Sequence, residues 1–188
     1  MGRPLLDPDH TLRTARCLLR RPAMSDAQAM FEALGPGRVP EHSPFSLIES
    51  IADVEAQLER HAGRWLSDHG VTFAITDGRD GRFLGETSVF RQTDRWMLGY
   101  WIAVDAWGRG LATEAARALV DLVFDVLEAE HVWAGTVVEN PASARVLQKL
   151  GFVQREEPIE PYAFADRRFE AVGWDLTRAA WRSGRPQD

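Results

Sequence analysis

The sequence predicts one α/β (α+β) domain, built on a mixed β-sheet with helices packed against both faces. Its 188 residues, 45% of them hydrophobic and 27% charged, fit a single compact domain with a proper core. Segments with strand and helix periodicity alternate along the chain. No internal repeat, low-complexity tract or Ser/Gly-rich linker divides it. We therefore expect one domain over 1–188, with a flexible segment at 1–10 and a core over about 11–177.

Residues 12–20 are expected to form the first strand, and a helix should follow it. Ser25 and Gln28, three residues apart, have the capping-box pattern that opens a helix. Gly35 stands where a helix C-cap glycine is common. The first helix is therefore expected to end at Leu34.

An irregular, proline-rich stretch over 36–47 separates this helix from a second one. Apolar residues then recur at helical spacing; they are Ile51, Val54, Leu58, Ala62 and Trp65. Strands are expected at 71–75 and 83–91. They should pair as a hairpin, because the residues at 77–81 between them are rich in turn formers.

The second half of the chain holds the clearest elements. The strand expected over 96–104 is apolar on both faces, which is typical of a central strand. A helix over 111–129 has one apolar face and contains no Gly or Pro. A short strand at 132–138 precedes a helix at 140–151, which has Asn-Pro at its start and Gly at its end. The tail, 152–176, should supply one last hairpin.

Composition excludes several classes of protein. The single cysteine, Cys17, rules out an intrachain disulfide, and without a Cys/His cluster no zinc site or other metal site is expected. The sequence shows neither a signal peptide nor a membrane span, so we expect a cytoplasmic protein without a membrane partner. The net charge of -6 argues against a nucleic-acid partner and leaves room for a cationic one.

The connection between the central strand and the long helix carries the main chemical signal. Gly108-x-Gly110-x-Ala112 places small residues at the start of a helix, where free backbone N–H groups and the helix dipole favour a phosphate. A tight turn that needs only permissive backbone angles explains the same pattern. A dinucleotide fingerprint would need a third glycine at Thr113, and the chain has no Gly-Lys-Ser/Thr loop.

Two ordered motifs give this turn its context. GYWI at 99–102 with WGRGLATEA at 107–115 resembles the acetyl-CoA motif of the GNAT superfamily, and closely its ribosomal-protein N-terminal acetyltransferase (Rim-type) branch. NPASARVLQKLGF at 140–152 resembles the Asn-x-x-Ser motif of the same branch, and LRTARCLLR at 12–20 resembles its opening strand. The resemblance covers most of the chain.

The resemblance implies the GNAT fold, a mixed and mostly antiparallel sheet that splays apart to admit acetyl-CoA as co-substrate. The pantetheine arm would pair with the backbone of Trp101, Ile102, Ala103 and Val104, near Asn140 and Ser143. The pyrophosphate would lie on the turn, formed by Gly108, Arg109, Gly110, Leu111, Ala112 and Thr113. Since Trp107 replaces the superfamily's usual Gln or Arg, Arg109 is the nearest cation.

The same resemblance implies direct attack of an amine on the thioester, with the oxyanion held by a strand N–H. The tyrosine that many members use as general acid is replaced by Leu147, which leaves Ser143 as the candidate to protonate or orient the thiolate. Glu86 is the candidate to take the amine proton, directly or through water.

Each candidate has a structural alternative. Ser143 could serve only the helix cap, and Glu86 could be an exposed or Arg-paired strand carboxylate. His42 and Tyr162 are further residues that could meet the acceptor. The side chains of Tyr100 and Trp101 are expected in the core.

Three classes of function therefore compete. The first is an N-acetyltransferase acting on a protein N-terminal α-amine or on a small-molecule amine. The second is a noncatalytic acyl-CoA-binding sensor, and an NAD-binding domain is a weaker third because its motif fails at Thr113. Whether the chain forms a homodimer is left open.

Overall fold

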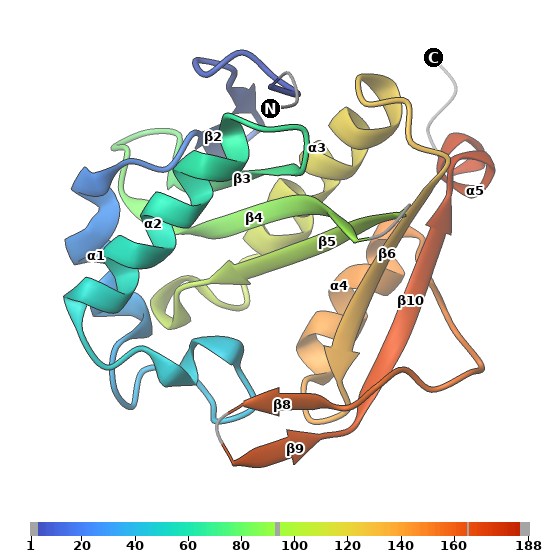
Figure 1. Ribbon diagram of the computed structural model, residues 1–188. Helices are drawn as coiled ribbons and strands as arrows, with labels where there is room; N and C mark the ends of the chain where they lie inside the picture. Colours follow the sequence, from blue (N-terminus) through green and yellow to red (C-terminus); the bar gives the residue numbers. More distant parts are fainter. Residues whose placement is uncertain (1–3, 93–94, 165, 185–188) are drawn as a thin grey trace.

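A computed structural model describes residues 4–92, 95–164 and 166–184 of the chain (Figure 1). The strands are β1 (Leu12–Arg13), β2 (Cys17–Arg20), β3 (Gly70–Asp77), β4 (Phe83–Gln92), β5 (Arg95–Ile102), β6 (His131–Val137), β7 (Val153–Gln154), β8 (Tyr162–Phe164), β9 (Arg167–Phe169) and β10 (Ala171–Thr177). The α-helices are α1 (Ala27–Leu34), α2 (Ile51–Trp65), α3 (Leu111–Asp125), α4 (Pro141–Leu150) and α5 (Arg178–Ser183). Short 3₁₀ turns are η1 (Met24–Asp26), η2 (Pro44–Leu47) and η3 (Val104–Ala106).

Eight strands form one sheet in the order β1-β2-β3-β4-β5-β6-β10-β7, and β8 and β9 form a separate hairpin. β5 and β6 run parallel, whereas the other neighbouring strands described here run antiparallel. This architecture confirms the predicted mixed, mostly antiparallel sheet.

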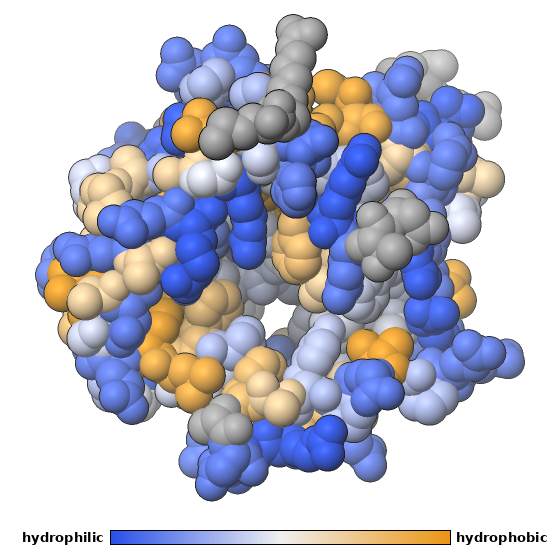
Figure 2. Space-filling model, in the orientation of Figure 1, coloured by the Kyte–Doolittle hydropathy of each residue, from blue (hydrophilic) through white to orange (hydrophobic). Residues whose placement is uncertain are grey.

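The parallel pair β5–β6 is also where the sheet splays. These strands pair only at Trp96 with Val132 and Met97 with Trp133. β5 continues to Ile102 and β6 to Val137 without further pairing to each other, so the two strands diverge (Figure 1). Figure 2 shows this face of the molecule hollowed where they part.

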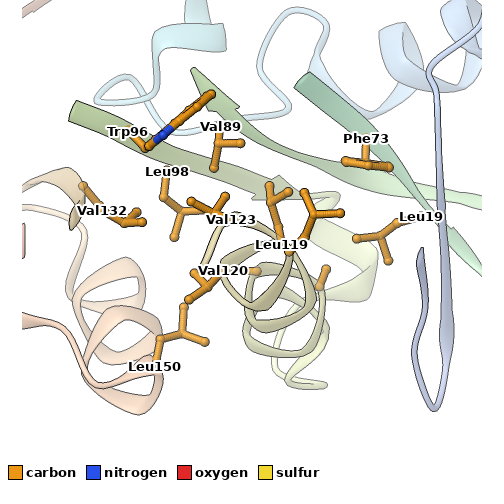
Figure 3. Close-up of a cluster of buried hydrophobic side chains, with 14 of the residues drawn as sticks. Leu19, Phe73, Val89, Trp96, Leu98, Leu119, Val120, Val123, Val132 and Leu150 are labelled. Carbon is orange, nitrogen blue, oxygen red and sulfur yellow. The ribbon is translucent and has the colours of Figure 1, made fainter. Parts of the chain in front are cut away.

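Helices α3 and α4 cover one face of the sheet, called here the α3–α4 face. Apolar residues of α3, such as Leu119 and Val123, pack against Phe73, Val89 and Leu98 of the strands (Figure 3). Burial of this extended apolar surface is the main force that holds these helices on the sheet.

Helices α1 and α2 cover the opposite face, called here the α1–α2 face. A second, smaller cluster joins Met30 of α1 and Val54 of α2 to Ala74 and Phe83 of the sheet, with Trp101 packed beside it. The predicted second helix is confirmed at Ile51–Trp65, and Ser50 and Asp53 form a capping box at its start.

The structure corrects the expected start of the chain. The single strand expected at 12–20 is a tight hairpin, because Thr14 accepts the Cys17 N–H with its hydroxyl and donates its own N–H to the Cys17 carbonyl. Leu6, within the segment expected to be flexible, is buried in the core; residues 1–3 lie outside the described residues.

The first helix ends at Leu34 as predicted, but the expected capping box at Ser25 is wrong. The Asp26 carboxylate accepts the Ala23 N–H and binds Arg20, so a 3₁₀ turn precedes a helix that begins at Ala27. Gly35 stands at the C-cap without the left-handed conformation typical of that position.

The tail is more than the expected hairpin. Beyond the hairpin β8–β9, strand β10 lies between β6 and β7 and pairs with β6 from Ala171 to Thr177. Such pairing across about 40 residues depends on cross-strand contacts, which local sequence does not reveal.

Candidate active site

The turn that precedes α3 has the conformation that a phosphate site requires. Gly108 and Gly110 have φ values of 72° and 76°, in the left-handed region that favours glycine. Gly110 is the N-cap residue of α3, and no side chain caps this helix. The first N–H groups of α3 therefore lack intrahelical acceptors and can bind an anion.

The N-terminus of α4 is different, because a side chain of the chain itself caps it. The Asn140 Oδ1 atom accepts the Ser143 N–H at 3.0 Å, and Pro141 follows at the first helical position. Asn140 is thus the helix cap, and the Ser143 hydroxyl takes no part in capping.

A second cation lies at the turn beside the exposed Arg109. Arg16 donates to the Arg109 carbonyl at 2.8 Å and forms an ion pair with Glu114 of α3 at 2.6 Å. Burial alone would raise the pKa of Glu114, but hydrogen bonds from Thr14 and Arg16 outweigh it, and the pKa is lowered. The sequence did not indicate Arg16 as part of this turn, because 93 residues separate it from Arg109.

A cavity of about 440 Å³ adjoins this turn on the side of the β1–β2 hairpin. It is lined by Thr14, Gly110, Thr113, Glu114, Arg117, Ala118 and Asp121. Two of these residues, Gly110 and Thr113, belong to the predicted pyrophosphate site.

The backbone predicted to pair with pantetheine is partly engaged within the protein. The Trp107 indole N–H donates to the Ile102 carbonyl at 2.6 Å, and the Ala103 N–H donates to the Leu84 carbonyl at 2.8 Å. Trp107 itself is 53% exposed. A pantetheine arm would therefore meet a strand end that this indole already contacts.

Ser143 has a partner that the sequence did not indicate. Its hydroxyl lies 2.9 Å from the Tyr100 hydroxyl, which also lies 3.1 Å from the Ser143 carbonyl oxygen. Burial raises the pKa of Tyr100, although its hydrogen bond to Ser143 acts in the opposite direction. The Tyr100 side chain packs against the core as expected, and its hydroxyl also links β5 to α4.

Glu86 lies on the opposite face of the sheet and is 3% exposed. The Trp101 indole N–H donates to its Oε2 atom at 3.0 Å, and His61 Nδ1 lies 3.2 Å from its Oε1 atom. Glu86 is thus neither an exposed carboxylate nor one paired with an arginine. Trp101 also does more than pack, because its indole holds a buried carboxylate.

Tyr162 lies across the splay from these residues. A Cβ atom at Gly135 of β6 would overlap its hydroxyl, which is buried and has no hydrogen-bond partner among the described residues. Burial raises the pKa of this phenol. β6 therefore needs a glycine at position 135 to accommodate the hairpin β8–β9.

The proline-rich loop reaches the same hairpin. His42 packs against Phe169 with a ring-centroid distance of 6.5 Å, and Glu41 pairs with Arg167. Phe45 of η2 packs against Trp101 at 5.5 Å. The loop therefore connects the two sides of the splay on the α1–α2 face.

The predicted residues fall into two groups. The first group lies along the end of β5 and the start of α3 and contains Ile102, Ala103 and the turn residues. Ser143 is joined to β5 through its contact with Tyr100. Glu86 is separated from them by the sheet.

In the described ranges no group of three or more His, Cys, Asp or Glu residues is arranged to hold a metal. No helix within the same ranges is long and apolar enough to cross a membrane.

The sheet parts beside an uncapped, glycine-bounded helix start, which is the arrangement expected of a transferase that binds acyl-CoA. The sequence profile of the acetyltransferase (GNAT) domain family matches residues 16–153. The chain belongs to this family, and it is an acetyl-CoA-dependent N-acetyltransferase.

Individual relatives agree with this assignment. The chain is 27% identical over 157 residues to the uncharacterized N-acetyltransferase YoaA of Bacillus subtilis, covering 81% of this chain and 88% of YoaA. Its fold is similar to that of RimL, a ribosomal L7/L12 α-N-protein acetyltransferase in complex with coenzyme A (TM-score 0.75, 12% identity, 89% and 98% coverage). It is also similar to a spermidine N-acetyltransferase SpeG chimera from Vibrio cholerae and hSSAT (TM-score 0.73, 17% identity, 91% and 100% coverage).

Proposed function

We propose that this enzyme transfers the acetyl group of acetyl-CoA directly to a primary amine, which enters from the α1–α2 face. Acetyl-CoA is held from the α3–α4 face, with its pyrophosphate on the N–H groups at 108–113. Glu86 lies on the path of the amine proton, and Ser143 faces the departing thiolate. A protein N-terminal α-amine is the preferred acceptor, supported by the motif resemblance and by the likeness to RimL.

One observation carries this proposal. Tyr100 and Trp101 are neighbours on β5, so their side chains point to opposite faces of the sheet. Tyr100 bonds to Ser143 on the α3–α4 face, and Trp101 bonds to Glu86 on the α1–α2 face. The candidate groups for the two proton transfers therefore lie on opposite sides of β5, close to where the sheet opens.

The Tyr100–Ser143 pair suggests how a serine assists the thiolate. The Tyr100 proton can be donated to the Ser143 carbonyl or to its hydroxyl, because both oxygens lie within 3.1 Å. When the tyrosine donates to the hydroxyl, the serine proton is free to point at the thiolate sulfur. A phenol is ordinarily protonated at neutral pH, and burial raises the pKa of Tyr100 further, so its hydroxyl can donate.

The test is release of CoA thiol from acetyl-CoA with a panel of acceptors. The panel should contain peptides with a free N-terminus, the same peptides with a blocked N-terminus, polyamines and small primary amines. Thiol release that depends on a free N-terminus supports the preferred acceptor, and release with polyamines alone replaces it with a small-molecule acceptor. Absence of amine-dependent release across the panel contradicts the proposal.

Removal of the hydroxyl pair should lower turnover more than it lowers acetyl-CoA affinity. We expect Ser143→Ala and Tyr100→Phe each to reduce kcat by about tenfold, a fraction of what a full general acid supplies. The double variant should be little worse than either single one, because the two groups act as a unit. Steady-state kinetics and acetyl-CoA titrations measure both effects. Normal turnover in Ser143→Ala would show that this hydroxyl has no catalytic role.

Substitution of Gly135 should affect the acceptor and spare the cofactor. Gly135→Ala forces the Tyr162 hydroxyl away from β6, so we expect the acceptor KM to rise several-fold, with acetyl-CoA KM unchanged. Gly173→Ala is the matched control, because Gly173 pairs with Gly135 in register. A Cβ atom at either position would meet Ile159, but at Gly135 the nearest group is Tyr162, whereas at Gly173 it is Arg155. Equal effects of both variants on the acceptor KM would argue against a role for Tyr162.

A further inference from the structure

A buried polar cluster lies between α2 and the sheet, within an otherwise apolar interface. Glu86 of β4 is 3% exposed and His61 of α2 is 6% exposed. The neighbouring buried residues of α2, Val54, Leu58 and Trp65, are all apolar. Burial of a carboxylate and an imidazole together is costly unless they are paired, so this arrangement requires an explanation.

Two donors hold one oxygen of the carboxylate. The Trp101 indole donates to Glu86 Oε2 at 3.0 Å, and the Gln57 amide donates to the same atom at 3.4 Å. Gln57 and His61 are four residues apart on α2, so one face of this helix delivers both side chains to Glu86.

The other oxygen faces the imidazole. His61 Nδ1 lies 3.2 Å from Glu86 Oε1, close enough for an ion pair, yet neither atom completes a hydrogen bond of acceptable geometry. Both atoms are buried and have no other partner among the described residues. A proton between them, carried by the Nδ1–H tautomer or by the imidazolium, would join both atoms, so the two side chains can hold a proton in common.

Few other charges face this pair. Arg64, one turn beyond His61 on α2, interacts with the Glu86 charge; burial and the nearby Arg60 lower its pKa, whereas Glu86 opposes that change. In the cross-strand row through Glu86, β3 contributes Ala74, and β2 contributes Arg20, which its ion pair with Asp26 neutralises. The buried residues of α1 are Ala27, Met30 and Leu34, all apolar.

From this arrangement we infer that His61 is a positioning residue for Glu86, and that the two side chains take up the acceptor's proton as one unit. This inference rests on the proposed function. An ammonium acceptor passes one proton, through water, to the pair, whose net charge changes from -1 to 0. The neutral amine then uses its lone pair to form the C–N bond, the C–S bond breaks, and a second amine proton leaves with the CoA thiol.

The test is the pH profile of kcat/KM for His61→Gln, measured with an amine that the wild-type enzyme acetylates. We expect kcat to fall about 10- to 100-fold near neutral pH. This loss is smaller than the full rate contribution of a general base, because Glu86 is still present. The acidic limb should move, because the carboxylate alone would then take up the proton that the pair shares in the wild type. Acetyl-CoA affinity should not change. His61→Asn should reproduce the shift if the first variant folds poorly.

His131→Gln is the matched control. His131 also pairs with a carboxylate, since its Nε2 lies 3.0 Å from Asp175 Oδ1, but this pair lies on β6 and β10. The control should leave the pH profile unchanged. An unshifted acidic limb in folded His61→Gln, or an equal shift in the control, would overturn the inference. Absence of amine-dependent turnover in the wild type would instead reject the proposed function.

Discussion

Gly110→Val should weaken acetyl-CoA binding by about 10- to 150-fold, as expected if one charge-assisted hydrogen bond of about 1.5–3 kcal/mol is lost. Gly110 has a φ of 76° and forms the N-cap of α3. A valine side chain would occupy the space beside the free N–H groups and would shift the turn towards a conformation that non-glycine residues adopt. Calorimetric titration with acetyl-CoA measures the loss.

The control for backbone strain is Gly81→Val. Gly81 has nearly the same φ, 75°, and lies in the β3–β4 turn, where a Cβ atom would meet nothing within 4 Å. This variant should suffer a similar conformational cost, about 1–2 kcal/mol, without loss of acetyl-CoA affinity. Unchanged affinity in a folded Gly110→Val would refute the placement of the pyrophosphate.

Glu86→Gln should have the largest effect on catalysis, lowering kcat/KM by about 10²- to 10⁴-fold, the usual contribution of a general base. The amide has nearly the same shape as the carboxylate and can still accept the Trp101 N–H. It cannot take up a proton from the acceptor at neutral pH. Acetyl-CoA affinity should stay within about twofold of wild type, because the carboxylate lies on the opposite face of the sheet from the turn.

Asp26→Asn is the control for Glu86→Gln. It shows whether the loss of kcat/KM is specific to Glu86 or follows from removing any buried carboxylate charge. Asp26 is 6% exposed and binds Arg20 at 2.6 Å, so it is a buried carboxylate on the same face with a purely structural partner. We expect it to lower the free energy of unfolding by about 1–3 kcal/mol and to retain kcat. If both variants lose kcat equally, Glu86 is a structural carboxylate.

Local signals in the sequence predicted the helices well. The apolar spacing of α2 and the Asn-Pro start and glycine end of α4 agree with the structure, including Gly151 in the left-handed conformation. α3 begins at Leu111 as expected but ends at Asp125, four residues before the predicted end. Such signals succeed because hydrophobic periodicity and capping depend on neighbours within one or two turns.

The functional candidates were predicted less completely, because their partners are distant in the chain. Ser143 and Glu86 were named from motif and strand position, but Tyr100 lies 43 residues from Ser143 and His61 lies 25 residues from Glu86. His61 offered no signal of its own, since a lone histidine on a helix has no recognisable spacing. Only the packing of α2 on β4 brings the two side chains together.

The sequence by itself determined the family, the helices α2, α3 and α4 and the glycine-bounded turn, because these depend on residue identity and on short-range periodicity. Only the tertiary structure decided that Tyr100 binds Ser143 and that Glu86 is buried beside His61. These contacts arise from the pairing of distant strands and from the packing of helices on opposite faces. Their energy depends on burial and geometry, which folding alone establishes.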